Sequence, residues 1–254
     1  TVGGVTVDNI TAANSNNLSG TTTLDATGLI TFATAASVFN TLAVEADGGV
    51  AVNVDLSTDT GALAIDSDID NGDSGTLNFA AGVTVASADT LSLDAAATAG
   101  IVGAGALDLD AAEGITINNN LTTAGATDLV ADSDADDGVG TLTLAASVTL
   151  DTTNSALTIT AEDLDLSGTG IDSGTASTTI TDSDGNGIGL GDTVSTTGLD
   201  ISTAELQKIT ATGLELVSGG NIDVDNVLAA NTANVSGTLT LDSAADINVL
   251  NNSI

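Results

Sequence analysis

The chain has 254 residues and carries one Lys or Arg against 35 Asp and Glu, which gives a formal net charge of −34. Such a charge repels nucleic acid and anionic membranes and attracts divalent cations. Histidine, cysteine, tyrosine and tryptophan are absent. Their absence excludes Ser-His-Asp and Cys-His catalysis, and also zinc sites built on imidazole or thiolate.

The remaining composition favours a folded chain made of strands. Hydrophobic residues make up 42% of the chain and the mean hydropathy is +0.33, whereas disordered chains combine high charge with low hydrophobicity. Proline is absent, which fits a chain whose residues almost all border a paired strand. No apolar run approaches the ~18 residues of a membrane helix, and no signal-type segment opens the chain. We expect no membrane insertion, and either a mature product or a piece of a longer protein.

Short segments of alternating apolar residues follow one another along the chain, and each predicts a strand with one buried face. In chain order they are LAVEA (42–46), VAVNVDL (50–56), LSLDA (91–95), LDLDA (107–111), ITIN (115–118), LTLAA (142–146), LTITA (157–161), LELVS (214–218), IDVDNV (222–227) and LTLDS (239–243). Segment 202–209 instead predicts one helical turn, because Ser202 can cap it and Glu205 follows three residues later.

These segments are self-similar. Residues 62–90 and 128–155 both contain a strand, an acidic loop, a Gly-Thr-Leu strand and a Val-Thr strand. Residues 107–120, 214–227 and 239–252 each contain L-x-L, a short turn, Ile-x-Val or Ile-x-Ile, and asparagine. Equivalent strands lie roughly 18–30 residues apart, which is the range of parallel β-helix coils. Because one coil cannot bury its own apolar face, such coils stack on a shared core.

The pattern therefore predicts an all-β fold, a parallel β-solenoid of about ten coils. It would form one elongated domain over residues 1–254. A β-sandwich is the alternative, because it also gives short alternating strands and turns. The few aromatic residues, the absence of proline and the internal repeats favour the solenoid.

Three acidic loops carry the strongest chemical signal. Segments 66–72, 132–138 and 182–187 place acidic or amide side chains at alternate residues and then a glycine, as the first half of a calcium loop does. Calcium takes six to eight oxygen ligands, and alternate residues of a tight turn bring several together. The bidentate Glu of an EF-hand is missing, because Thr193 stands in its place and Asp192 is one residue early. The predicted calcium ligands are Asp66, Asp68, Asp70, Asp132, Asp134, Asp136, Asp182, Asp184, Asn186 and Asp192.

Two other functions stay open at this point. A pair of carboxylates could hydrolyse glycans, although sugar-processing clefts usually offer aromatic and basic residues that this chain lacks. Thr-x-Thr at 141–143, 158–160 and 238–240 could form an ice-binding row. Threonine is also simply a good strand former, and the irregular spacing favours that interpretation.

Two segments near the C-terminus resemble the repeats of a known family. ELQKITATGLELVSGGNIDVDNVLAA (205–230) and GTLTLDSAADINVLNN (237–252) are similar to repeats of filamentous-haemagglutinin-like proteins, the giant bacterial surface adhesins of the two-partner-secretion and autotransporter type. The resemblance is clearest over 199–254 and weaker over 20–160. It implies a right-handed parallel β-helix, export, and a role at the cell surface.

The two ends of the sequence suggest self-association. Residues 1–10 and 246–254 both predict strands, with no evident polar or helical cap, and uncapped strand edges invite pairing. We expect a non-enzymatic extracellular structural or adhesive protein stabilised by calcium, either a filament subunit or a stalk segment of an adhesin. Its expected partners are further copies of itself, joined end to end, and a cell-surface or glycan receptor.

Overall fold

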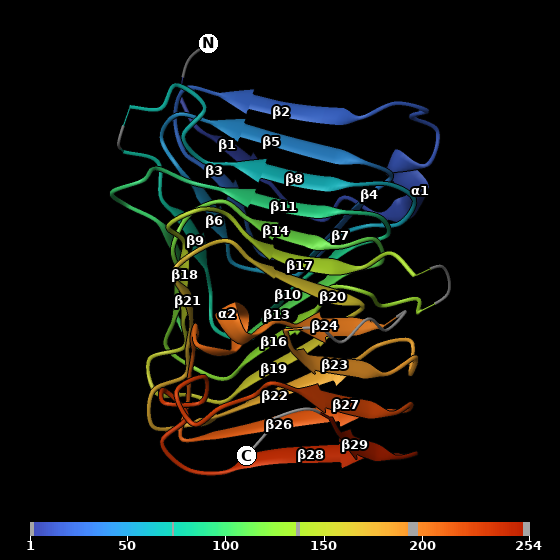
Figure 1. Cartoon of the computed structure of the whole chain (residues 1–254). Coiled ribbons are helices and arrows are strands. Elements are labelled where there is room, and N and C mark those ends of the chain that lie inside the picture. The colour runs from blue at the N-terminus through green and yellow to red at the C-terminus, as the bar shows by residue number, and fades with distance from the viewer. Residues whose placement is uncertain (1–2, 73, 136–137, 193–197, 251–254) are drawn as a thin grey trace.

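The computed structural model describes residues 3–72, 74–135, 138–192 and 198–250. The chain winds into a β-solenoid of about ten coils with three faces (Figure 1). Neighbouring strands in each sheet come from successive coils and run parallel. The predicted all-β solenoid is confirmed, and the β-sandwich alternative is wrong because its hairpins would give antiparallel pairs. Within the described residues no helix is long and apolar enough to cross a membrane.

Each coil passes from the first face to the second and then the third. The first face holds, in order, β1 (Val5–Val7), β3 (Ile30–Phe32), β6 (Val50–Val52), β9 (Leu77–Phe79), β12 (Ile101–Gly103), β15 (Leu121–Thr123), β18 (Thr149–Asp151), β21 (Gly170–Asp172) and β25 (Ile209–Thr210). The second face holds β4 (Ser37–Phe39), β7 (Leu56–Thr58), β10 (Val83–Ser87), β13 (Leu107–Ala111), β16 (Thr127–Val130), β19 (Leu157–Ala161), β22 (Ser177–Asp182), β26 (Gly213–Ser218) and β28 (Leu239–Ser243).

The third face is made of two sheets laid end to end. The longer sheet holds β2 (Thr22–Ala26), β5 (Leu42–Ala46), β8 (Leu63–Asp66), β11 (Leu91–Asp94), β14 (Ile115–Ile117), β17 (Thr141–Leu144) and β20 (Asp163–Leu166). The shorter sheet holds β24 (Leu199–Ile201), β23 (Ile188–Gly191), β27 (Ile222–Asp225) and β29 (Ile247–Val249). Since β24 contacts β20, the second sheet continues the line of the first.

The core is a set of apolar columns that run along the solenoid. On the first face Ile30 is in register with Val50, and Val50 with Leu77, and all three are fully buried. The alternation seen in the sequence puts one such residue inward at every second position of a strand. Fully burying a side chain of this kind contributes about 1.5–3 kcal/mol, so the stacked columns stabilise the coils collectively.

Two short helices interrupt the strands. The turn predicted at 202–209 is confirmed as α2 (Thr203–Leu206), where the Ser202 side chain accepts a hydrogen bond from the backbone N–H of Glu205. The expectation of no helical cap at the N-terminal end is wrong for the second face, whereas β1 and β2 are the first strands of the other two faces. Helix α1 (Ala12–Ser15) takes the place of a second-face strand in the first coil and packs beside β4. Its short, locally capped sequence gave no apolar periodicity from which to predict it.

The order of strands changes once, at β24. This strand follows β23 in the sequence but lies between β20 and β23 in space. Side chains from the α2 region close the adjoining edge of β20. The Glu205 carboxylate accepts a hydrogen bond from the backbone N–H of Leu166 at 3.3 Å, and Lys208 Nζ donates to the Leu166 carbonyl oxygen at 2.5 Å.

Candidate cation-binding site

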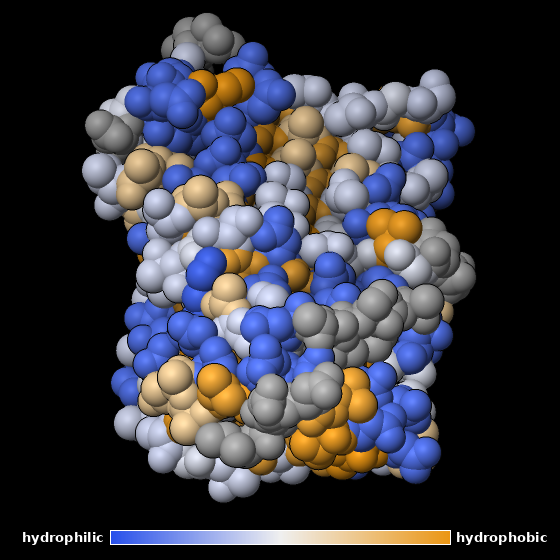
Figure 2. All heavy atoms as spheres, in the orientation of Figure 1, coloured by the Kyte–Doolittle hydropathy of each residue, from blue (hydrophilic) through white to orange (hydrophobic). Residues whose placement is uncertain are grey.

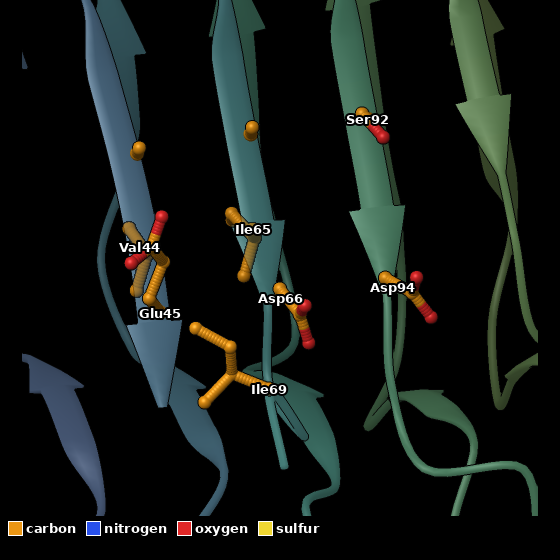
Figure 3. Close-up of a pocket in the computed structure, with 9 residues that line it drawn as sticks. Val44, Glu45, Ile65, Asp66, Ile69, Ser92 and Asp94 are labelled. Carbon is orange, nitrogen blue, oxygen red and sulfur yellow. The ribbon is translucent and has the colours of Figure 1, made fainter. Parts of the chain in front are cut away.

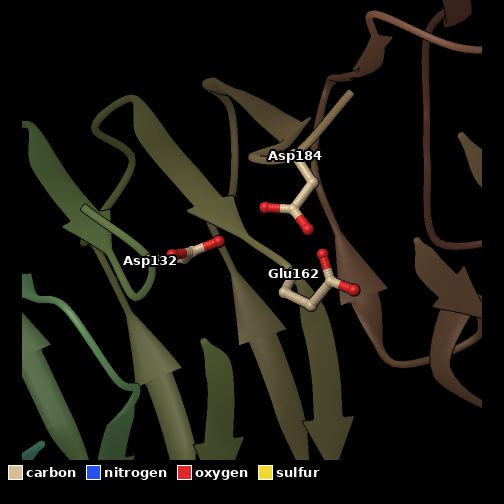
Figure 4. A group of neighbouring side chains, drawn as sticks. All are labelled: Asp132, Glu162 and Asp184. Carbon is tan, nitrogen blue, oxygen red and sulfur yellow. The ribbon is translucent and has the colours of Figure 1, made fainter. Parts of the chain in front are cut away.

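Three carboxylates from three successive coils meet where the chain turns from the second face to the third. Asp132 follows β16, Glu162 follows β19 and Asp184 follows β22, and these strands are neighbours in the second face. One oxygen from each carboxylate lies within 4.8 Å of one oxygen from each of the others (Figure 4). We call these three residues the corner triad. Among the described residues, the corner triad is the group of three acidic side chains that lie close enough together to hold a metal ion.

Asp132 is the anchored member of the corner triad. Its side chain is 2% exposed. One carboxylate oxygen accepts a hydrogen bond from the backbone N–H of Ala135 at 3.0 Å, and the other accepts one from Ser183 Oγ at 2.5 Å. Because Ser183 belongs to the same coil turn as Asp184, this contact already ties the two outer coils of the triad together.

Glu162 and Asp184 have unused binding capacity. Asp184 Oδ2 accepts a hydrogen bond from Asn186 Nδ2 at 3.1 Å, whereas the buried atoms Asp184 Oδ1 and Glu162 Oε2 accept none from the described residues. Buried polar atoms without a partner are costly and rare in folded proteins. A bound cation or a shared proton would satisfy both oxygens.

Glycines allow the loop before β17 to fit over these carboxylates. The carbonyl oxygen of Gly140 accepts a hydrogen bond from the backbone N–H of Glu162 at 3.0 Å. A β-carbon on Gly138 would lie 3.8 Å from Glu162 Oε1 and 4.0 Å from Asp184 Oδ2. The segment Gly138–Gly140 therefore lies directly against the corner triad and sets the position of Glu162.

The crowded negative charge shifts one of these groups. Desolvation is the largest of the effects that raise the pKa of Glu162 to about 7. Hydrogen bonding and Coulomb repulsion from Asp184 come next, and repulsion from Asp182 and Asp132 adds to them. Near neutral pH, Glu162 therefore alternates between holding a proton and presenting a full negative charge. A divalent cation would compete with that proton for the same oxygens.

The loop 182–187 divides its predicted ligands between two roles. Asp182 lies at an inward position of β22 and is 3% exposed. Its Oδ2 accepts hydrogen bonds from the Gly187 backbone N–H and from Ser218 Oγ, both at 2.9 Å. Asp182 thus stabilises the corner from inside the solenoid, whereas Asp184 contributes its carboxylate to the corner triad. Asn186 is exposed and reaches the site only through Asp184.

The other predicted ligands lie elsewhere. In the loop 66–72 the backbone N–H of Asp68 donates to Asp66 at 3.0 Å, and Gly72 N–H donates to Asp70 at 2.9 Å, so two of these carboxylates brace their own turn. Asp134 is exposed and Asp136 lies outside the described residues. Asp192 is also exposed, and it accepts a hydrogen bond from Thr203 Oγ1.

The structure changes which acidic loops are equivalent. The sequence repeat matched 66–72 with 132–138, but the first joins β8 to β9, at the turn from the third face to the first, and the second joins β16 to β17. That equivalence is wrong. Loops 132–138 and 182–187 share one corner of the solenoid, two coils apart, and the intervening coil contributes Glu162. Aligning LVAD (129–132) with ITAE (159–162) would have revealed Glu162, because these segments are in register in β16 and β19.

A second acidic surface runs along the third face. Asp25, Glu45, Asp66 and Asp94 stand in register on four neighbouring strands. The last three line a shallow hollow of about 200 Å³, with Ile69 at its edge (Figure 3). Burial raises the pKa of Asp94, which the backbone N–H of Ala95 partly offsets. This column attracts cations but does not bring three carboxylate oxygens as close together as the corner triad does.

The Thr-x-Thr segments do not form one row. Residues 141–143 lie in β17 on the third face, whereas 158–160 lie in β19 and 240 in β28 on the second face. On the second face, β26 interrupts the threonines by placing Glu215 in register with Thr179 and Thr240.

The fold and its repeats define this chain as a β-helix repeat protein. No protein-family model, no curated protein and no solved structure matches it.

Proposed function

We propose that the chain is a non-enzymatic extracellular structural β-solenoid whose stacked coils are tied together by calcium at the corner triad. The observation that carries the proposal is the origin of the three ligands: Asp132, Glu162 and Asp184 come from three successive coils and meet within 4.8 Å. An ion bound there would link coils rather than fill a single loop.

Such an ion would stabilise the folded state selectively. The three carboxylates are far apart in the sequence, so the unfolded chain offers no equivalent site. A ligand that binds the native state alone stabilises it by about 2.7 kcal/mol at a hundredfold excess over the dissociation constant. Calcium accepts bidentate carboxylates and completes its shell with water or backbone carbonyls, which suits the free oxygens of Glu162 and Asp184.

The biological setting that we propose follows from shape and charge. A stacked rod with a net charge of −34 resists lateral aggregation and suits a filament or the stalk of a surface adhesin. The resemblance of residues 205–230 and 237–252 to filamentous-haemagglutinin-like repeats supports an exported adhesin of a bacterial surface. In that role the rod would hold a region that binds a cell-surface or glycan receptor at a distance from the bacterial cell.

Thermal unfolding in calcium tests this proposal. Saturating calcium should raise the melting temperature by about 5–10 °C, since 1 kcal/mol moves it by about 2–4 °C at this chain size, and chelator should reverse the gain. Asp184→Asn and Glu162→Gln should lose most of the shift. Asp134→Asn removes the same charge from an exposed position and should keep it. Equal shifts in all three variants, or no shift beyond that of magnesium, would overturn the proposal.

A glycan hydrolase is the second candidate, because Glu162 has a raised pKa of about 7 beside other carboxylates, as a general acid requires. The composition argues against it. Sugar-processing clefts usually offer aromatic and basic residues, whereas this chain has three aromatic residues and one Lys or Arg. Release of reducing sugar from glycans, lost in Glu162→Gln, would favour the enzyme.

A further inference from the structure

The C-terminal coil leaves part of the hydrophobic core uncovered. Ile247 and Val249 of β29 are in register with Ile222 and Val224 of β27. In β27 these residues are 0% and 7% exposed, but in β29 they are 46% and 64% exposed. Leu250, which follows β29, is 48% exposed. Figure 2 shows apolar surface gathered at this lower end of the molecule. These side chains occupy core columns that no described coil covers.

The opposite end of the rod carries an apolar hollow. A cavity of about 410 Å³ opens between β1, α1, β2 and β4. Its apolar lining includes Val7, Ile10, Leu18, Leu24 and Phe39. Leu18 is 51% exposed. The last described coil therefore exposes apolar side chains, and the first described coil contains an apolar hollow.

Both features adjoin the third face. Strand β2 is the first strand of that face and β29 is the last (Figure 1). An edge strand presents unpaired backbone N–H and C=O groups along one side. In this fold they are satisfied by a parallel strand about 4.8 Å away, with the core column continued beneath it. The N-terminal coil of a second copy supplies both.

We propose that the C-terminal coil of one molecule stacks on the N-terminal coil of the next, with β29 beside β2 and with Ile247 and Val249 over the apolar hollow. This inference rests on the proposed structural role and gives its assembly a specific interface. The contact joins two different surfaces of the same molecule, so it does not close on itself and propagates into a filament.

The charges at the junction favour one register. Asn248, between the two apolar residues of β29, donates from Nδ2 to Asp223 Oδ1 at 2.7 Å. Its amide carries a second N–H. If Asn248 lies opposite Asp25 of the next copy, its second N–H gains a carboxylate acceptor. The neutral Asn248 then also separates Asp223 of one molecule from Asp25 of the next. The same register sets Ile247 opposite Leu24, an inward position of β2 that is in register with Val44.

The second face contributes less to this junction. Helix α1 stands where the first coil would otherwise have a second-face strand, so β28 meets no strand edge there. Backbone pairing across the junction therefore depends on the third face. A substitution in β29 should consequently affect assembly more than an equivalent one in β28.

Engineered cysteines test the junction directly, because the chain has none of its own. Paired residues of neighbouring parallel strands lie within the Cα separation that a disulfide spans. Under mild oxidation in calcium, the double variant Asp25→Cys with Asn248→Cys should give a ladder of dimers, trimers and longer species on a non-reducing gel. Each single variant can give dimers at most. The double variant Asp108→Cys with Asn248→Cys places the first cysteine at an exposed mid-rod position of β13 and should give no ladder.

The outcomes separate this inference from the proposed function. A ladder confined to the Asp25–Asn248 pair supports the junction. No ladder, or the same ladder from the Asp108 pair, overturns it. If the calcium-dependent rise in melting temperature persists in those variants, the proposed function survives and only the end-to-end contact fails.

Discussion

Gly140 lies so close to Asp132 that a β-carbon on Gly140 would be 2.2 Å from the β-carbon of Asp132 and 2.7 Å from its Cγ. The backbone of Gly140 also has a φ of +156°. The anchored carboxylate of the corner triad thus depends on a residue that has no side chain. The carbonyl of the same residue positions Glu162, so one glycine sets the geometry of two ligands.

Replacing Gly140 with alanine should therefore cost both stability and calcium binding. We expect Gly140→Ala to lower the free energy of unfolding by about 1–3 kcal/mol, because packing must shift around the added methyl group, and to reduce the calcium-dependent rise in melting temperature. Gly82→Ala is the matched control. Gly82 has a φ of +77° but nothing within 4 Å of an added β-carbon, so it should lose stability without losing the calcium effect. An unchanged calcium response in Gly140→Ala would contradict the assigned geometry.

The raised pKa of Glu162 predicts a specific pH dependence in the absence of metal. The carboxyl group has a pKa of about 7 when folded, against 4.5 ordinarily. Between these values the folded state holds a proton that the unfolded state has released, so stability falls as pH rises. The contribution is complete below the lower value and is lost as pH passes through the upper one. Thermal melts in chelator from about pH 5 to pH 8 should show this decline.

Glu162→Gln isolates that contribution from the general relief of negative charge at low pH. The variant should lose less stability than the wild type over the same pH range, because glutamine does not titrate. In calcium, the wild-type stabilisation should be larger at pH 8 than at pH 6, since protons and cations compete for Glu162. Parallel pH profiles for the two proteins would show that Glu162 is not the responsible group.

The Ser183 hydroxyl should be important for stability as well as for the site. Ser183→Ala removes a hydrogen bond to the buried Asp132 carboxylate and should cost about 1–3 kcal/mol, the penalty of leaving a buried acceptor unsatisfied. Ser167→Ala removes a hydroxyl that donates to the exposed Asp165 and should cost less than about 0.5 kcal/mol. Urea unfolding measures both. Similar small losses for the two would mean that Asp132 is satisfied in another way.

Assembly should depend on the exposed core residues of β29. Val249→Asp puts a charge among apolar groups at the proposed junction, and the side chain is already 64% exposed, so the fold should tolerate it. Light scattering should show particle mass rising with concentration for the wild type in calcium and staying constant for the variant. Val102→Asp, at a 38% exposed position in the middle of the first face, should assemble as the wild type does. If Val249→Asp also assembles normally, the filament contact lies elsewhere.

The sequence predicted the strands better than it predicted their neighbours. Alternation placed LDLDA (107–111) and LELVS (214–218) in strands, as the structure confirms for β13 and β26, because the period of two is a local property. Which loops share a corner depends on the number of residues in every intervening turn. The similarity of 66–72 to 132–138 therefore misled, and the contribution of Glu162 was missed. Glu162 is followed by Asp163 and Asp165, which alternate with leucine in strand β20, so the segment resembles none of the acidic loops.

The inserted strand β24 has a mechanical consequence. In a parallel solenoid the hydrogen bonds between stacked strands point along the rod. A pull on the two ends of the rod therefore stretches these hydrogen bonds along their own direction. In the described part of the chain the third-face ladder is divided between β20 and β24, and side chains such as Glu205 and Lys208 bridge that level instead. Stretched along its axis, the rod has a weak cross-section near its middle there, and yielding at that level would leave an N-terminal block and a C-terminal block that each keep paired strands on all three faces.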